Sequence, residues 1–544
     1  MPSRSRRPRA SRISRRTFLG GLAAAGVVAC TSDSGGDSSG TSTTTGPLPD
    51  LPTLPDDPFT IGVASGDPLP DGVVLWTRLA PDPQSDAAMP DVDVPVTWEL
   101  AADEGFGDVV QSGTAVTGPA LAHSVHVDVR GLEPGRHYWY RFTVGSHESP
   151  VGRTWTAPAT DASPERIAFA VASCQAYQSG YYTAYRHLAD EDLDFVLFVG
   201  DYIYELEASA AVRPHGLAPP RTLAEFRTFY GLNKTDPDLQ RAHAAFPWIV
   251  TWDDHEVEDN YADLEPGGVG LALDPDAAAT FAAKRAAAYR AYWEHMPLRV
   301  GPPSDEDLRI YRDFRFGDLV NLPVLDDRQY RSPILEGEGA GNLPRGAGGG
   351  PLLPETFDES RTMLGDEQEA WLAETLERSD AEWQVIVQQT VMAEVDRAPG
   401  DPTRGFSMDA WDGYVAARRR LLGLVEDGEI DNVIVVGGDI HTSAVTDLKV
   451  DYEDPDSPVV ASEFVGTSIS ALELLPENFA EATLTNDHIH LYDTEHRGYL
   501  RCEATRDGFT ADFRSLSSAT ELDGTIDTTS SWTVEAGRPG AQPA

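Results

Sequence analysis

The stretch DFVLFVGDYIYE, from Asp194 to Glu205, joins an apolar run of strand length directly to a group of polar side chains. A continuous apolar run of this length is typical of a strand that is buried on both faces of a sheet. Segments with a helical pattern separate this run from others like it, at residues 222–232, 277–296 and 411–428. Alternating buried strands and helices predict a layered α/β domain.

Four further apolar runs also end in polar side chains. The five polar groups are Cys174-Gln175, Asp201 to Glu205, Asp253 to Glu256, Asp326 to Arg331 and Asp439 to Ser443. One such aspartate alone would be read as the cap of the next helix. Open α/β sheets, however, bind ligands at the carboxyl ends of their strands. If all five groups meet at the end of one sheet, the crowded carboxylates need a cation to offset their repulsion, which predicts a metal site.

The types of side chain indicate which metals would bind. A thiolate from Cys174 and a phenolate from Tyr204 favour a transition ion such as ferric iron, whereas the surplus carboxylates suit calcium or magnesium. Asp201 lies three residues before Tyr204, so both side chains can reach one ion, and the Asp201 carboxylate can bridge to a second ion. His441 follows Asp439 by two positions, on the same face of an extended segment.

These residues carry a family resemblance. The motifs GDYIYE, WDDHE, LDDRQYR and GGDIHTS, after a strand that ends in ASCQ, resemble in content and order those of PhoD-type alkaline phosphatases of the metallophosphoesterase superfamily. The resemblance extends from about Phe59 to Leu516 and includes EFVGTSIS and RGYL. The superfamily's usual D-x-H, GNH and GH-x-H motifs are altered here to Ser173-Cys174-Gln175, Asp253-Asp254-His255 and Gly438-Asp439-Ile440-His441, and PhoD-type enzymes share these changes.

The resemblance implies a metallophosphoesterase-type layered β-sheet core flanked by helices. It also implies a metal-dependent phosphatase that hydrolyses small phosphate esters by attack of a metal-activated hydroxide. We assign ferric iron (Fe3+) to Cys174, Asp201, Tyr204 and His441. Asp201 would bridge to calcium (Ca2+), which Asp254, Asp439 and Asn260 complete.

Two residues are candidates for catalysis. His255 would protonate the leaving group or stabilise the transition state, as the motif histidine does in the superfamily; the alternative is a supporting role away from the reacting atoms. Arg328 would hold phosphate through two hydrogen bonds, and its alternative is a salt bridge to Asp326 or Asp327. Glu205 and Glu256 are expected to lie outside the metal ligands.

Other functions remain open at this point. The same metals would serve a phospholipase D-type phosphodiesterase, and the preference between monoesters and diesters is not determined. A surface-displayed binding protein without catalysis is the alternative from another class.

The first thirty residues predict export. Arg15 and Arg16 precede the apolar run LGGLAAAGVVA, a pattern that the Tat translocase reads. VVAC resembles a lipobox in which Cys30 becomes lipidated, and the alternative is a plain cleaved signal peptide. We therefore expect an extracellular, cell-surface or periplasmic protein that meets the membrane only through a lipid at Cys30.

The acidic composition excludes some partners. The net charge of −46 repels nucleic acid, so binding through basic patches is excluded. It also repels phosphate esters, so a phosphate site must be made locally positive by metal ions or arginines. We expect a monomer.

The chain is expected to contain five parts. These are a signal peptide at 1–30, a flexible tether at 31–58, a fibronectin III-like β-sandwich at 59–158, the catalytic domain at 164–520 and a tail at 521–544. Cys502 alternates with apolar residues and is expected to be a packed free thiol. A disulfide between Cys174 and Cys502 is the alternative.

Overall fold

A computed structural model describes residues 48–54, 56–205, 211–267, 277–303, 307–335, 351–398, 405–472 and 479–544. The expected signal peptide, Cys30 and most of the tether lie outside these ranges. The described residues belong to one compact unit. None of their helices combines the length and apolarity that crossing a membrane requires.

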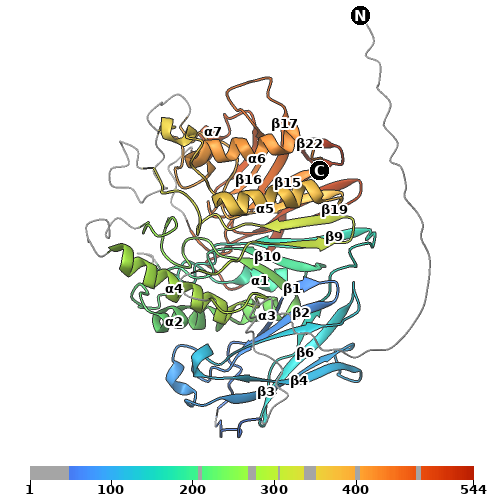
Figure 1. Ribbon diagram of the computed structural model, residues 1–544, viewed down its shortest axis with the longest axis vertical. Coiled ribbons are helices and arrows are strands. Elements are labelled where there is room, and N and C mark those ends of the chain that lie inside the picture. Colours follow the sequence, from blue (N-terminus) through green and yellow to red (C-terminus); the bar gives the residue numbers. More distant parts are fainter. Residues whose placement is uncertain are drawn as a thin grey trace, which may run out of the picture. The chain divides into compact units, whose positions relative to one another are not determined.

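Two β-sheets form the centre of this unit (Figure 1). The first has the strand order β22 (Arg538–Pro543), β21 (Ile526–Glu535), β20 (Gly508–Leu516), β19 (Gly498–Thr505), β9 (Arg166–Ala172), β10 (Phe195–Val199), β11 (Pro247–Thr251), β1 (Val63–Leu69), β2 (Gly72–Arg78), β5 (Ser124–Arg130). The second has the order β12 (Arg312–Phe316), β13 (Val320–Val324), β14 (Trp383–Val387), β15 (Val433–Gly437), β17 (Val459–Val465), β16 (Ser443–Lys449), β18 (Ile489–Asp493). Strands β9, β10 and β11 are parallel neighbours, and so are β13, β14 and β15.

The two sheets pack face to face, and the strand period of two explains how. On β10, Phe195, Leu197 and Val199 join the core between the sheets, whereas Val196 and Phe198 join the core on the outer face. Both faces are therefore buried, which is why this strand appears in the sequence as a continuous apolar run.

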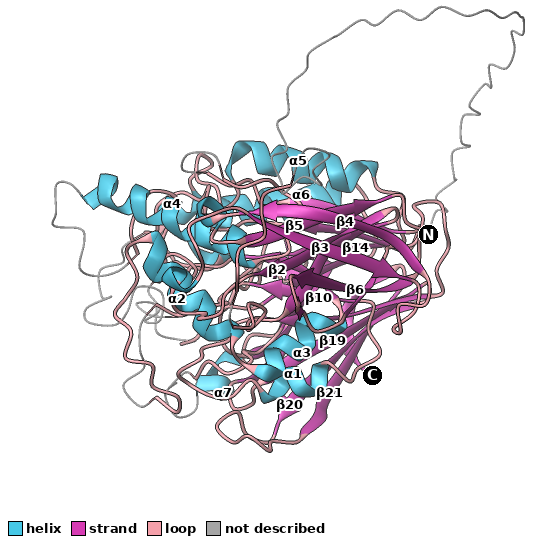
Figure 2. Cartoon of the chain, turned by 90° about the horizontal axis from the view of Figure 1, so that it is seen from below, coloured by secondary structure: helices cyan, strands magenta, loops and turns pink. Residues whose placement is uncertain are grey.

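Helices cover the outer faces. Helices α1 (Thr183–Leu188), α2 (Leu223–Lys234), α3 (Pro237–Ala245) and α4 (Ala277–His295) pack on the first sheet, and α5 (Gly365–Arg378) and α6 (Val415–Asp427) on the second. A short helix, α7 (Phe479–Thr483), lies beside β18. Figure 2 shows the strands gathered together with helices on their outer sides. The expected layered α/β core is confirmed, and the helices predicted at 222–232, 277–296 and 411–428 correspond to α2, α4 and α6.

Local sequence explains where α2 begins. The Thr222 hydroxyl accepts a hydrogen bond from the Glu225 backbone, and the Glu225 carboxylate accepts one from the Thr222 backbone. This reciprocal pair satisfies two amides that a helix start otherwise leaves without partners.

The N-terminal β domain is less separate than the sequence indicated. Its smaller sheet contains β4 (Val109–Thr117), β3 (Val94–Ala101), β6 (His137–Val144), β7 (His147–Glu148) and β8 (Gly152–Trp155). Its other strands, β1, β2 and β5, continue the ten-stranded sheet, because β1 pairs in parallel with β11 of the catalytic region.

The expected tail at 521–544 is also different in the structure. Residues 526–543 form the antiparallel hairpin β21–β22, which extends the ten-stranded sheet beyond β20. This segment is therefore an integral edge of the catalytic sheet.

Candidate metal centre

The polar groups of the five apolar runs follow strands of both sheets. Cys174, Asp201 and Asp254 follow β9, β10 and β11, whereas Arg328 follows β13 and Asp439 follows β15. The argument for a metal site supposed that all five groups meet at the end of one sheet, whereas they follow strands of two sheets. The face-to-face packing nevertheless brings side chains from both sheets to one centre.

The backbone of this centre is unusual. Five residues that are not glycine have a left-handed conformation, with φ of 57° at Cys174, 61° at Asp201, 57° at Asn260, 66° at Asp439 and 51° at His441. Such residues are uncommon, and each costs on the order of 1 kcal/mol unless the surroundings hold it in place. Because five such residues lie at this centre, the surrounding structure must hold their backbone in a conformation that these residue types disfavour.

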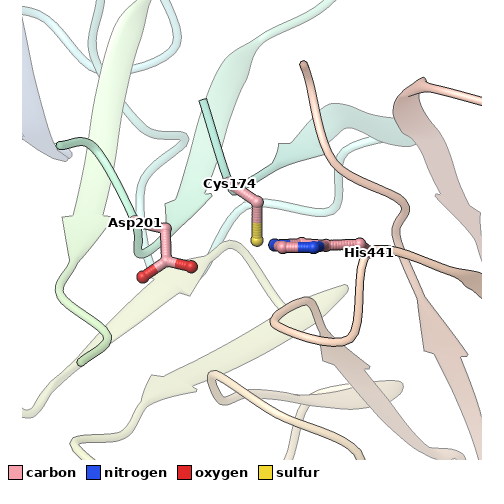
Figure 3. A group of neighbouring side chains, drawn as sticks. All are labelled: Cys174, Asp201 and His441. Carbon is pink, nitrogen blue, oxygen red and sulfur yellow. The ribbon is translucent and has the colours of Figure 1, made fainter. Parts of the chain in front are cut away.

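A thiol, a carboxylate and an imidazole form the first group of side chains. Ligand atoms of Cys174, Asp201 and His441 all lie within 4.8 Å of one another. In Figure 3 the Cys174 sulfur lies between the Asp201 carboxylate and the His441 ring. The Tyr204 hydroxyl lies 2.9 Å from Asp201 Oδ2 and 2.9 Å from His441 Nε2. The four residues that the sequence assigned to iron are therefore adjacent.

Carboxylates form a second group on the other side of Asp201. Oxygen atoms of Asp201, Asp253, Asp254 and Asp439 lie within 4.8 Å of one another. Burial raises the pKa of Asp201 and Asp253 well above the usual range and that of Asp439 to about 6. Burial also opposes the ionisation of Asp254, but Arg328 and His255 outweigh it and lower the pKa of Asp254.

The oxygen atoms of this second group fit a cation. Asp253 Oδ2 and Asp254 Oδ1 are buried and accept no hydrogen bond from the described residues. A buried carboxylate oxygen without a donor is costly unless a cation or water meets it. Hard oxygen ligands of this kind are those that calcium and magnesium prefer.

Asn260 and Thr390 also contact these acids. The Asn260 backbone amide donates a hydrogen bond to Asp254 Oδ2, and the Thr390 hydroxyl donates one to Asp439 Oδ2 at 2.8 Å. Ligation by the Asn260 side chain stays a prediction. Thr390 follows β14, and its hydroxyl gave no sequence signal.

His255 is oriented by an acid that the sequence did not single out for this role. His255 Nδ1 lies 2.6 Å from Glu205 Oε2, and Glu205 also accepts a hydrogen bond from the Asp259 backbone amide. Burial alone would lower the pKa of His255, but Glu205, Asp254 and Asp201 raise it well above its usual value. The neighbouring acids therefore favour the protonated imidazole over the neutral one.

Glu256 supports the loop that carries Asp201. Its carboxylate accepts hydrogen bonds from the backbone amides of Asp201, Tyr202 and Asp253 at 3.0, 2.6 and 2.9 Å. It thereby joins the loops that follow β10 and β11. Both Glu205 and Glu256 lie outside the candidate metal groups, as we expected.

Arg328 lies deep inside the protein, where its side chain is 0% exposed. Its guanidinium bonds Asp253 and both oxygens of Asp409, the latter at 2.8 and 2.9 Å. Its Nη2 lies 3.5 Å from Asp439 and 3.7 Å from Asp254. Binding of phosphate by Arg328 stays a prediction, and this geometry favours instead a fixed counter-charge for the acids. Asp409, the acid that anchors Arg328, follows no predicted strand and carried no recognisable signal.

Neither cysteine of the described residues forms a disulfide. Cys502 lies in the core between the sheets, and Cys174 packs with Tyr204 and Ala471 at the centre. The expectation of a packed free thiol at Cys502 is confirmed.

Two helix-flanked sheets, with thiol, imidazole and carboxylate groups converging at the ends of their strands, define a metallophosphoesterase-type protein. The chain belongs to the PhoD-like phosphatase family. The family's model matches residues 169–513, and the model of the PhoD-like phosphatase N-terminal domain matches residues 48–158. The protein is accordingly a hydrolase of phosphoric ester bonds.

Two known proteins resemble the chain over most of its length. It is 44% identical over 494 residues to alkaline phosphatase D of Bacillus subtilis strain 168, covering 89% of this chain and 82% of that protein. A solved structure of PhoD is 42% identical, with a TM-score of 0.84 over 91% of this chain and 93% of that one.

Proposed function

We propose that this protein is an exported, metal-dependent alkaline phosphatase that acts on small phosphate esters. The observation that carries the proposal is the position of Asp201. Among the described residues, three groups of side chains are close enough together to hold a metal ion: the two above and a third of Asp201, Asp254 and His255. The Asp201 carboxylate belongs to each of them. It can therefore bridge two ions, and adjacent ions can clamp a phosphate and activate water.

The donor types divide the centre into two metal sites. Cys174, Asp201, Tyr204 and His441 would hold ferric iron, and Asp201, Asp254, Asp439 and Asn260 would hold calcium. Bound ions would supply the local positive charge that a protein of net charge −46 otherwise lacks and would lower the pKa of a bound water.

His255 is the candidate general acid. Glu205 accepts the hydrogen bond of Nδ1–H, which turns Nε2–H away from Glu205. From Nε2 the imidazolium can donate a proton to the leaving oxygen of the ester. Arg328 keeps the carboxylates partly neutralised while the ions bind.

Metal analysis and two substrates test this function. Purified protein should contain iron and calcium and should hydrolyse p-nitrophenyl phosphate. Faster hydrolysis of bis-p-nitrophenyl phosphate would identify a phosphodiesterase with the same metals. Absence of activity on both esters in metal-loaded protein would contradict the proposed function.

The purified protein should be coloured, because phenolate and thiolate ligands give ferric iron charge-transfer absorption. Tyr204→Phe should shift or bleach the visible band and lower the iron content. Tyr202→Phe is the matched control, since the Tyr202 hydroxyl bonds His243 at 2.8 Å and not the centre. Fully active protein without iron or colour would refute the iron assignment.

Export should depend on the arginine pair. Replacing Arg15 and Arg16 with lysine keeps the charge but should leave precursor in the cytoplasm, measured by cell fractionation. Cys30→Ser should release the exported protein from the membrane. If the Cys30→Ser protein stays at the membrane, the lipid anchor is excluded and only the predicted signal peptide stands.

A further inference from the structure

Residues 467–471, which we call the strap, connect the two loops that carry Cys174 and His441. The strap follows β17; its residues 467–470 end the motif EFVGTSIS, and Ala471 comes directly after that motif. Its Ile469 amide donates to the Ser173 carbonyl at 2.9 Å, and its Ala471 amide donates to the Cys174 carbonyl at 3.2 Å. On the other side, the Thr467 hydroxyl contacts the His441 carbonyl at 3.3 Å, as the longer branch of a hydrogen bond that the His496 carbonyl shares.

These two loops come from different sheets. Cys174 follows β9 of the first sheet and His441 follows β15 of the second, so no strand ladder fixes their separation. Both residues also have a left-handed backbone. A strained loop persists only when its surroundings determine it, and the strap supplies hydrogen bonds to both loops at once.

Arg497 holds the strap in place. It belongs to the motif RGYL, directly precedes β19, and is 6% exposed. Its Nε donates to the Ala471 carbonyl at 2.6 Å, and its Nη1 donates to the His496 carbonyl at 2.7 Å. The Thr467 hydroxyl lies 2.8 Å from that same His496 carbonyl. The guanidinium thus bonds one end of the strap directly, at Ala471, and reaches the other end through the His496 carbonyl that Thr467 also bonds.

We propose that Arg497 is a positioning residue that, through the strap, sets the separation of Cys174 from His441. The part of this inference that concerns iron binding rests on the proposed function. The other part, that the strap keeps Cys174 covered, concerns the folded chain without metal.

Thiol labelling tests the inference without any metal. In metal-free full-length protein carrying Cys30→Ser, labelling is followed separately at Cys174 and Cys502 by mass spectrometry. Arg497→Gln and Thr467→Val should each raise the labelling rate of Cys174 about tenfold or more, through local opening, and leave Cys502 unchanged. The control is Arg501→Gln on the same region of chain, because Arg501 pairs with Glu503 and Asp512 and not with the strap.

The outcomes separate the inference from its rivals. Unchanged Cys174 labelling in Thr467→Val and Arg497→Gln overturns it, and so does an equal rise at both cysteines, which reports general unfolding. If Arg497→Gln does not fold, Thr467→Val decides alone. In loaded protein, the same variants should lose iron to a chelator about tenfold faster than the Arg501→Gln control. Wild-type protein without iron contradicts the metal assignment, while the labelling result still decides the role of the strap.

Discussion

Asp201→Asn should abolish phosphatase activity, with kcat lowered at least about a thousandfold, or roughly 4 kcal/mol of lost transition-state stabilisation. Asparagine keeps the shape of the side chain but removes the negative charge, and its amide nitrogen cannot bind a cation. Because the Asp201 carboxylate lies in all three candidate metal groups, one substitution should affect both ions. The visible band should disappear together with the activity.

The measurement combines kcat, metal content and the absorption spectrum of each variant. Asp190→Asn is the control, since that carboxylate is 65% exposed and pairs only with surface Arg241. Loss of activity with both metals and colour retained would show that Asp201 does not bridge two ions. Retained activity in Asp201→Asn would refute the proposed metal centre.

Arg328→Met should destabilise the metal-free protein by about 3–5 kcal/mol, because it leaves buried acids without their counter-charge. Methionine fills much of the same volume, so the effect should come from charge more than from a cavity. Asp253 loses its direct partner, Asp409 loses one of two partners and keeps Arg331, and Asp254 and Asp439 lose a nearby positive charge. Metal ions should restore part of the stability, since they can neutralise the last two acids.

Denaturant unfolding with and without calcium measures this effect. The control is Arg378→Met, whose ion pair with Glu374 is at the surface and should contribute less than about 1 kcal/mol. Adding Asp253→Asn to Arg328→Met should recover stability, because the amide cannot ionise and therefore has no charge for burial to penalise. Normal stability in Arg328→Met, with loss only of phosphate binding, would instead favour the role predicted from the sequence.

The core strands were predictable because burial on both faces leaves a continuous apolar run. The strands β9, β10, β11, β13 and β15 all have this character, and each directly precedes one of the polar groups that the sequence identified. Strands that depend on their neighbours were missed. The segment VASGDPL of β1 contains residues typical of turns, yet it is a strand because it pairs with β2 on one side and β11 on the other.

Gly66 illustrates why this pairing lies beyond local sequence. A Cβ at this position would lie 2.4 Å from the Pro297 carbonyl oxygen and 2.7 Å from that of Trp248. The glycine therefore permits a close approach between segments that are distant in the chain. The hairpin β21–β22 likewise has few apolar residues, and it is ordered by its ladder with β20.

For the centre, the sequence by itself determined the types of candidate ligand and their place at strand ends, because both follow from a few neighbouring residues. Only the tertiary structure decided that the ends of two sheets share one centre. It also decided which charge compensates which: Arg328 pairs with Asp253 and Asp409, 75 and 81 residues away, and its guanidinium does not pair with the adjacent Asp326 or Asp327 in the described structure. Electrostatic energy depends on distance through space and on burial, and both are set by the packing of the two sheets.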